Sequence, residues 1–284
     1  MKRRIISLGQ RALQGEYTTV LAAGALQING SRVKRLCVAG QLEANKSLLG
    51  KVYCTGGLEA EEIQFTKLSV TGAADLTQVC KGDIASINGS ISADYLECRI
   101  LRNGNGRKRS RDKEEVGVCW QGVFHADTFE NCGSIRMSFE SRFRNIISHA
   151  SFSCQYDLEC ENFYSFSDLN AEAVNADRIF FLSRARVRVG QLTGSFVVVK
   201  RNFKADQLYK GLPKTLVHRT QNNPDQITLI ESIEADYIEL EYSKVDFISG
   251  NDIIIGDMCI IEYVEYRNSI TISEKAVVNE VVRI

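Results

Sequence analysis

The stretch SISADYLEC (residues 90–98) decides the fold, because it recurs as AVNADRIFF (residues 173–181) and SIEADYIEL (residues 232–240). The shared pattern is an apolar residue, any residue, a small residue, an acidic residue or Asn, any residue, and an apolar residue. The small residue of this phrase recurs at steps of 16, 33, 33, 34 and 16 positions, at Ala44, Ala60, Ala93, Ala126, Cys160 and Ala176. The later steps, to Ala205 and Ala235, are 29 and 30 positions. Repetition near multiples of one step predicts a stacked supersecondary unit.

Glycines mark the same step more sharply. They recur at steps of 16, 16, 16 and 17 positions, at Gly24, Gly40, Gly56, Gly72 and Gly89. Between them, apolar residues come in pairs two positions apart, as expected for the inward face of short strands. After Gly56 these residues are Leu58, Ala60, Ile63, Phe65, Leu68 and Val70. The rest of the chain alternates apolar and polar residues between Gly, Asn, Asp and Ser, without helical periodicity, which predicts an all-β protein.

One unit of this length cannot fold alone. Burying five or six side chains gains on the order of 10 kcal/mol, whereas ordering about 16 residues costs roughly 16 to 32 kcal/mol of backbone entropy. Neighbouring units must therefore share hydrogen bonds and one apolar interior. We predict a parallel β-helix solenoid with about 16–17 residues per coil, with like residues stacked over like.

The pattern divides the chain into four parts. Residues 1–23 are expected to form an N-terminal tail and first cap, and residues 24–207 the β-helix, with a basic loop inserted at residues 102–116. Residues 208–226, around the only two prolines, are expected to form an irregular excursion. Residues 227–284 should form a C-terminal β segment that continues or caps the solenoid.

The basic loop has the sequence RNGNGRKRSRDKEEV, with six basic and three acidic residues and no apolar ladder. A basic finger for nucleic acid or acidic lipid is one interpretation. A solvated loop at a coil corner is the other, and we favour it because the loop has no aromatic residues on which bases could stack.

Composition limits the location and partners. Lys+Arg and Asp+Glu are equal at 35 each, so no nucleic-acid partner is expected. The chain has no apolar run of roughly 18 to 20 residues, and the start MKRRIISLGQ lacks the apolar stretch of a secretory signal. Nine cysteines include no Cys-x-x-Cys pair and are expected to be reduced, buried thiols. These features predict a cytoplasmic protein, with association to a membrane left open.

The sequence predicts no enzyme, and therefore no catalytic, cofactor-binding or metal-binding residues. It has no nucleophile beside a base, no phosphate loop and no metal-ligand set, and His125, His149 and His218 are scattered. Hexapeptide acyltransferases keep a six-residue step, which 16 or 17 does not fit. A carbohydrate-acting β-helix enzyme stays an alternative, which a carboxylate cluster lining a groove would favour. A monomeric β-helix binding scaffold is the other, which a capped, polar end would favour.

Two stretches resemble the bactofilins, a family of bacterial polymer-forming cytoskeletal proteins. DLECENFYSFSDLNAEAVNADRIFF (residues 157–181) is similar to late coils of a longer, Firmicutes-type branch of that family, and residues 249–284 are similar to its end. The matching features of that end are Ile255-Gly256, Cys259, Val264-Glu265-Tyr266, Val277-Val278 and Glu280-Val281. The resemblance implies a right-handed β-helix, a structural function in the bacterial cytoskeleton, and polymerisation.

The final residues AVVNEVVRI (residues 276–284) alternate apolar and polar side chains and contain no proline. An end coil of this kind presents an unpaired strand edge over an apolar interior, which another chain can join. We therefore expect self-association through the solenoid ends. A membrane surface or cell-envelope proteins are further partners to consider.

Overall fold

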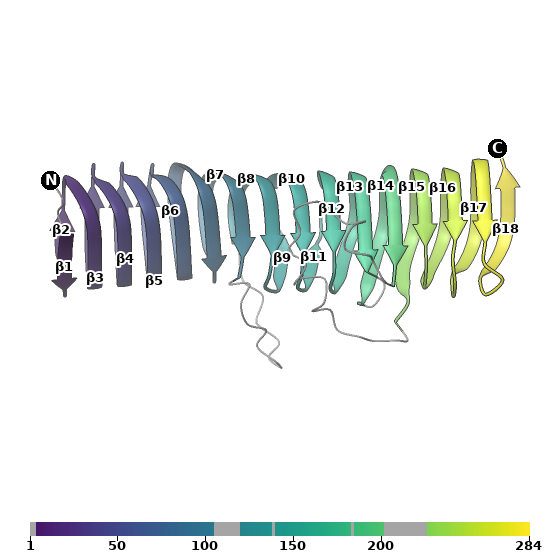
Figure 1. The fold of residues 1–284 in the computed structure, drawn as a ribbon, viewed down its shortest axis with the longest axis horizontal. Coiled ribbons are helices and arrows are strands. Elements are labelled where there is room, and N and C mark those ends of the chain that lie inside the picture. The colour runs from purple at the N-terminus through teal and green to yellow at the C-terminus, as the bar shows by residue number, and fades with distance from the viewer. Residues whose placement is uncertain (1–3, 105–119, 138–139, 183–184, 202–225) are drawn as a thin grey trace. The chain divides into compact units, whose positions relative to one another are not determined.

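The computed structural model describes residues 4–104, 120–137, 140–182, 185–201 and 226–284. The chain divides into two compact units, Met1–Phe143 (unit 1) and Arg144–Ile284 (unit 2). In each unit parallel strands are stacked as a β-solenoid, with about 15 turns in all, and the described residues form no helix (Figure 1). The predicted fold class is therefore confirmed.

Unit 1 is built from strands that each run through most of a coil. They are β1 (Arg4–Leu8), β2 (Arg11–Leu13), β3 (Glu16–Asn29), β4 (Arg32–Asn45), β5 (Leu48–Glu61), β6 (Gln64–Asn88), β7 (Ile91–Asn103), β8 (Trp120–Asn131) and β9 (Ile135–Met137). Strand β10 (Glu140–Ser148) runs from unit 1 into unit 2. From β3 to β6 paired residues are 16 positions apart, so that Val20, Leu36, Val52 and Leu68 form one fully buried column.

The glycine spacing has a backbone cause. Gly40 has a φ of +133°, a region that L side chains rarely adopt, and a Cβ at this position would lie 2.2 Å from the carbonyl oxygen of Gly24. The corner recurs with positive φ at the other glycines of the series. Coils therefore approach so closely at this corner that only glycine fits, once per turn.

The inward positions predicted from the pattern are confirmed for Phe65, Leu68 and Val70, which are 5%, 0% and 0% exposed. The prediction that like residues stack over like is confirmed for Ala44 and Ala60 but is wrong for the phrase around Ala126. Ala93 pairs with Gly122, whereas Ala126 pairs with Cys98. The step from β7 to β8 is 28 or 29 positions, because the chain that joins these strands adds residues to the coil. The 33 positions between Ala93 and Ala126 are therefore not two coil steps.

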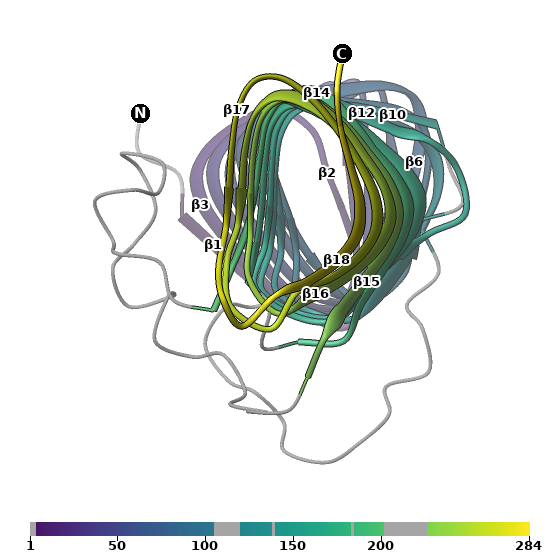
Figure 2. The ribbon, with the colours of Figure 1, turned by 90° about the vertical axis from the view of Figure 1, so that its right-hand side faces the viewer.

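Unit 2 repeats the architecture with less regular coils. Its strands after β10 are β11 (Phe152–Cys154), β12 (Leu158–Ser165), β13 (Leu169–Leu182), β14 (Val187–Lys200), β15 (Thr228–Leu240), β16 (Ser243–Ile255), β17 (Ile260–Ile272) and β18 (Val277–Arg283). From β12 onward each strand pairs in parallel with the next. Figure 2 shows β15 to β18 winding around one interior, which apolar side chains fill.

Strands occupy parts of two segments that were expected to lie outside the coils, the N-terminal tail and the basic loop. Residues 4–23, expected to be a tail and first cap, already hold β1, β2 and part of β3, because a coil begins around Gly9. Arg102, assigned to the basic loop, lies in β7, and residues 105–116 of that loop lie outside the described residues. Of the excursion at 208–226, only Gln226 is described. Because β15 pairs with β14, the C-terminal segment continues the solenoid.

Candidate functional site: the last coil of unit 2

The last coil of unit 2 exposes side chains that earlier coils bury. Leu192, Ile233, Ile248 and Val264 stack in one inward column, and each is 0% exposed. Val281 continues this column on β18 and is 41% exposed. Among the described strands, Val281 has a parallel neighbour on one side only, Val264 of β17, and β18 stands at the end of the row of strands in Figure 1.

A second inward column ends in the same way. Leu240 and Ile255 are 0% and 1% exposed, whereas Ile272, which pairs with Ile255, is 40% exposed. Strand β18 pairs along one edge with β17, so its other edge carries main-chain donors and acceptors that another strand could use. The last coil therefore combines an apolar surface with a strand edge.

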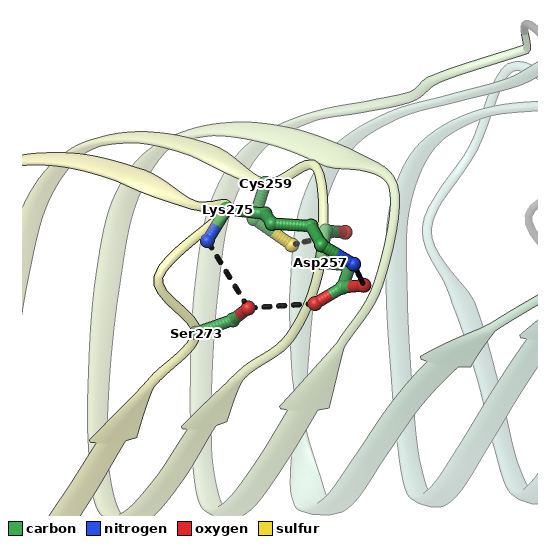
Figure 3. Close-up of polar contacts among 4 residues, drawn as sticks. All are labelled: Asp257, Cys259, Ser273 and Lys275. Carbon is green, nitrogen blue, oxygen red and sulfur yellow. Dashed lines mark hydrogen bonds and ion pairs between the residues drawn. The ribbon is translucent and has the colours of Figure 1, made fainter.

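A polar cluster holds the turn that leads into β18 (Figure 3). Lys275 Nζ donates to Asp257 Oδ2 at 2.8 Å, and Ser273 Oγ donates to Asp257 Oδ1 at 2.6 Å. The Lys275 main-chain N–H donates to Ser273 Oγ at 3.2 Å, and the Cys259 thiol lies 3.9 Å from the Asp257 carbonyl oxygen. These contacts tie the turn before β17 to the turn before β18.

The charges of this cluster favour a structural role. The hydrogen bond from Lys275, followed by that from Ser273, lowers the pKa of Asp257, and the same bond to Asp257 raises the pKa of Lys275. Lys275 therefore keeps its proton near neutral pH and cannot act as the base that would activate Ser273. The arrangement fixes a turn and offers no activated nucleophile.

Unit 1 has a shallow hollow of about 400 Å³ with acidic residues in its lining, as a carbohydrate-acting enzyme would need. The charged and polar side chains of this lining are Lys81, Glu97, Arg99, His125, Asp127 and Arg142. Glu97 is held by Lys81 at 2.6 Å, and His125 Nδ1 lies 2.9 Å from the Tyr95 hydroxyl. Opposite charges stacked from coil to coil are typical of a solvated surface. The residues that the structure describes include no group of three or more His, Cys, Asp or Glu that could hold a metal.

Five of the eight described cysteines are buried, and Cys37, Cys132 and Cys160 are partly exposed. The eight described cysteines are free, and Cys119 lies outside the described residues. Burial raises the pKa of Cys98 and Cys160 to about 12 and that of Cys54 and Cys259 to about 11. These groups are therefore neutral thiols near neutral pH, whereas nucleophiles and metal ligands need the thiolate.

Sequence reasoning named no site residues, and it missed the Lys81–Glu97 pair and the Asp257–Lys275 pair. The first could have been found, because Lys81 and Glu97 stand one coil step apart in the sequence. The second joins positions 18 apart across two turns, so the coil step does not predict it.

Among the described residues, no helix has the length and apolar character needed to cross a membrane. No protein-family model, curated protein or solved structure matches the chain at a significant level.

Proposed function

We propose that this chain is a non-enzymatic structural scaffold, similar to the bactofilins, that associates with copies of itself through the ends of its solenoid. The observation that carries the proposal is the exposure of Val281, the last member of a column whose other members are fully buried. A second copy would supply the coil that covers it.

The energetics favour such a contact. Fully burying a valine or isoleucine side chain is worth about 1.5 to 3 kcal/mol, and Val281, Ile272 and Ile284 are each 40% or more exposed. Strand pairing along β18 adds main-chain hydrogen bonds and fixes the register of the contact. A few side chains and one strand edge thus provide an orientation-specific contact, as a polymer needs.

The alternatives have less support. A monomeric binding scaffold calls for a polar cover over the end coil, whereas this end is apolar. A carbohydrate-acting enzyme calls for two carboxylates that can act as acid and base, whereas Glu97, one of the two in the hollow of unit 1, is ion-paired with Lys81. We also propose a cytoplasmic location, where the buried thiols would stay reduced.

The test is the mass and appearance of the purified protein, measured by light scattering and electron microscopy. We expect oligomers or filaments from the native chain and a lower mass from Val281→Lys, because the lysine places a charge where the next coil would pack. Asn279→Lys is the matched control: it adds the same charge to β18, but on the exposed outer side. Glu62→Lys is a second control, because Lys46 already occupies the equivalent left-handed corner one coil earlier. If the native protein and all variants are folded and monomeric, the proposal is contradicted and the monomeric scaffold is favoured.

A further inference from the structure

Unit 1 has an outer face on which side chains stack in three columns. The face is formed by residues 4–8, 19–23, 35–39, 51–55 and 67–71, which pair in parallel from β1 through β3, β4 and β5 to β6 (Figure 1). We call the outward side chains of these segments the N-terminal outer face. The columns are Arg4, Thr19, Arg35, Lys51 and Lys67; Ile6, Leu21, Cys37, Tyr53 and Ser69; and Leu8, Ala23, Ala39, Thr55 and Thr71.

The first column of the N-terminal outer face is basic, and no acidic residue stands in the columns beside it. It places four cations on successive or next-but-one coils, and the three columns contain no carboxylate. Within the described part of the chain none of these four cations forms an ion pair. By contrast, Lys81 and Arg99 of later coils are paired with carboxylates one coil away, Glu97 and Asp83.

Acidic residues gather on the adjoining face instead. Beyond the glycine corner, Glu43, Glu59 and Asp75 stack in one column of residues 41–45, 57–61 and 73–77. The zero net charge of the whole chain therefore conceals a separation of charge between two faces of unit 1. The N-terminal outer face is the positive one.

The other two columns of the N-terminal outer face are mostly apolar or small. Ile6 is 64% exposed, Leu8 is 84% exposed and Tyr53 is 37% exposed. Together with Leu21, Cys37 and the alanines they line a shallow, largely apolar hollow of about 370 Å³. Lys67 Nζ lies 5.7 Å from the centre of the Tyr53 ring, so the basic and apolar columns are in contact.

We propose that the N-terminal outer face binds the surface of an anionic lipid bilayer. The basic column would lie against the headgroup phosphates and carboxylates, while Ile6, Leu8 and Tyr53 would enter the boundary between headgroups and acyl chains. Near an anionic membrane, each Lys or Arg increases partitioning by about fivefold. Exposed apolar side chains beside these cations add the hydrophobic part that a purely basic patch lacks.

Two other occupants fit the face less well. Nucleic acid would use the cations but leaves the aliphatic columns without a partner, since Tyr53 is the only aromatic residue in them. The acidic face of a second copy would match the charge, but it would set Ile6 and Leu8 against Gln, Glu and Asn side chains and desolvate these polar groups. A bilayer satisfies the charge and the apolar columns together. The proposal does not depend on self-association of the solenoid ends.

The test is sedimentation of the full chain with vesicles of phosphatidylcholine, either alone or with about 30% phosphatidylserine. We expect binding to the anionic vesicles, which weakens as salt is raised. Arg35→Glu/Lys51→Glu should lower binding by at least about tenfold, since it removes two of the cations and adds two repelling charges. Ile6→Asn/Leu8→Asn should also lower it, and both positions are exposed enough that folding should be unaffected.

The matched control is Lys46→Glu/Arg136→Glu, which makes the same charge change at exposed positions outside the face. It should bind within about twofold of the native chain. The proposal is overturned if the native chain ignores anionic vesicles, if it binds neutral vesicles equally well, or if the control loses as much binding as Arg35→Glu/Lys51→Glu. Salt-sensitive self-association that Glu43→Lys/Glu59→Lys abolishes would instead assign the face to a second copy, and would also overturn it. Thermal melting of each variant separates lost binding from lost folding.

Discussion

Gly72 lies directly over Gly56, so that a Cβ on Gly72 would come within 2.1 Å of the Gly56 carbonyl oxygen. Its φ is +132°, which is strained for any residue with a side chain. We expect Gly72→Ala to destabilise unit 1 by about 3 kcal/mol or more, from strain and from the separation of two coils. The measurement is the urea midpoint of unfolding. Gly57→Ala is the control and should have little effect, because the nearest atoms to a Cβ there belong to the movable end of the Gln41 side chain.

Phe65 is a second test of the coil register. Its ring packs beneath Gly82 of the next coil, where a Cβ would lie 2.1 Å from ring atom Cε2. Phe65→Ala should lower the free energy of unfolding by about 3 to 5 kcal/mol, through lost burial and a cavity. The exposed neighbour Thr66 serves as the control, since Thr66→Ala should stay within about 0.5 kcal/mol. An unchanged unfolding midpoint for Phe65→Ala would mean that the ring is not part of the core.

The buried thiols predict a loss of stability at alkaline pH. An unfolded cysteine has a pKa of about 8.5, whereas folding raises that of Cys98 and Cys160 to about 12. Below about pH 8 both states keep these protons. Above it the unfolded chain loses protons that the folded chain retains, so the free energy of unfolding should fall as the pH rises toward the folded pKa.

The measurement is urea unfolding at neutral pH and near pH 10, with Cys98→Ala/Cys160→Ala beside the native chain. The double variant should lose less stability over this range. Alanine fits these positions because Cys98 pairs with Ala126 and Cys160 pairs with Ala176. Equal losses of stability at alkaline pH in both proteins would mean that other groups cause the effect.

The number of free thiols is a separate prediction. In denaturant without reductant, nine free thiols should titrate, and a count of seven or fewer would reveal a disulfide.

The Asp257–Lys275 pair should control fraying of β18. Asp257→Asn removes the charge that Lys275 contacts, so amides such as that of Val277, which donates to the Cys259 carbonyl, should exchange hydrogen faster. Because the pKa of Asp257 is lowered in the folded chain, the pair stabilises above the unfolded carboxyl pKa near 3.9 and loses this effect as the pH falls through the lowered value. Asp246→Asn, at an exposed position of unit 2, is the control. Equal exchange in both variants would contradict a stapling role.

The sequence was most informative where the backbone itself restricts residue type. The glycine corner could be predicted from Gly24 to Gly89, because a close approach of two main chains admits one residue only. Burial of Phe65 could be predicted because the apolar residues two positions before it and three positions after it repeat the spacing of apolar residues in the preceding coils. Both predictions rest on coils of nearly equal length that are stacked without interruption.

The register of the later coils and the position of the first coil could not be predicted, because they depend on irregularities that composition does not reveal. The phrase around Ala126 does not lie at the predicted corner, because the chain between β7 and β8 lengthens this step to 28 or 29 positions. The coil at Gly9 was missed because it precedes Gly24 by one position less than the common step. The N-terminal outer face was within reach, since Arg35, Lys51 and Lys67 recur at one step of 16. The inward apolar pattern does not reveal it, because its side chains point outward.

The pairing of β14 with β15 has a further consequence. Val199 lies beside Leu240, although the two are far apart along the chain. The strands pair as if they were one coil step apart. The hydrogen bonds between β14 and β15 depend on the sequences of these two strands and not on the length of the chain that joins them. Arg201 is still tied to the next coil, because its main-chain N–H donates to Glu241 Oε2 at 3.0 Å. A fluorescent protein or an affinity tag grafted between Arg201 and Gln226 should therefore leave the flanking coils aligned.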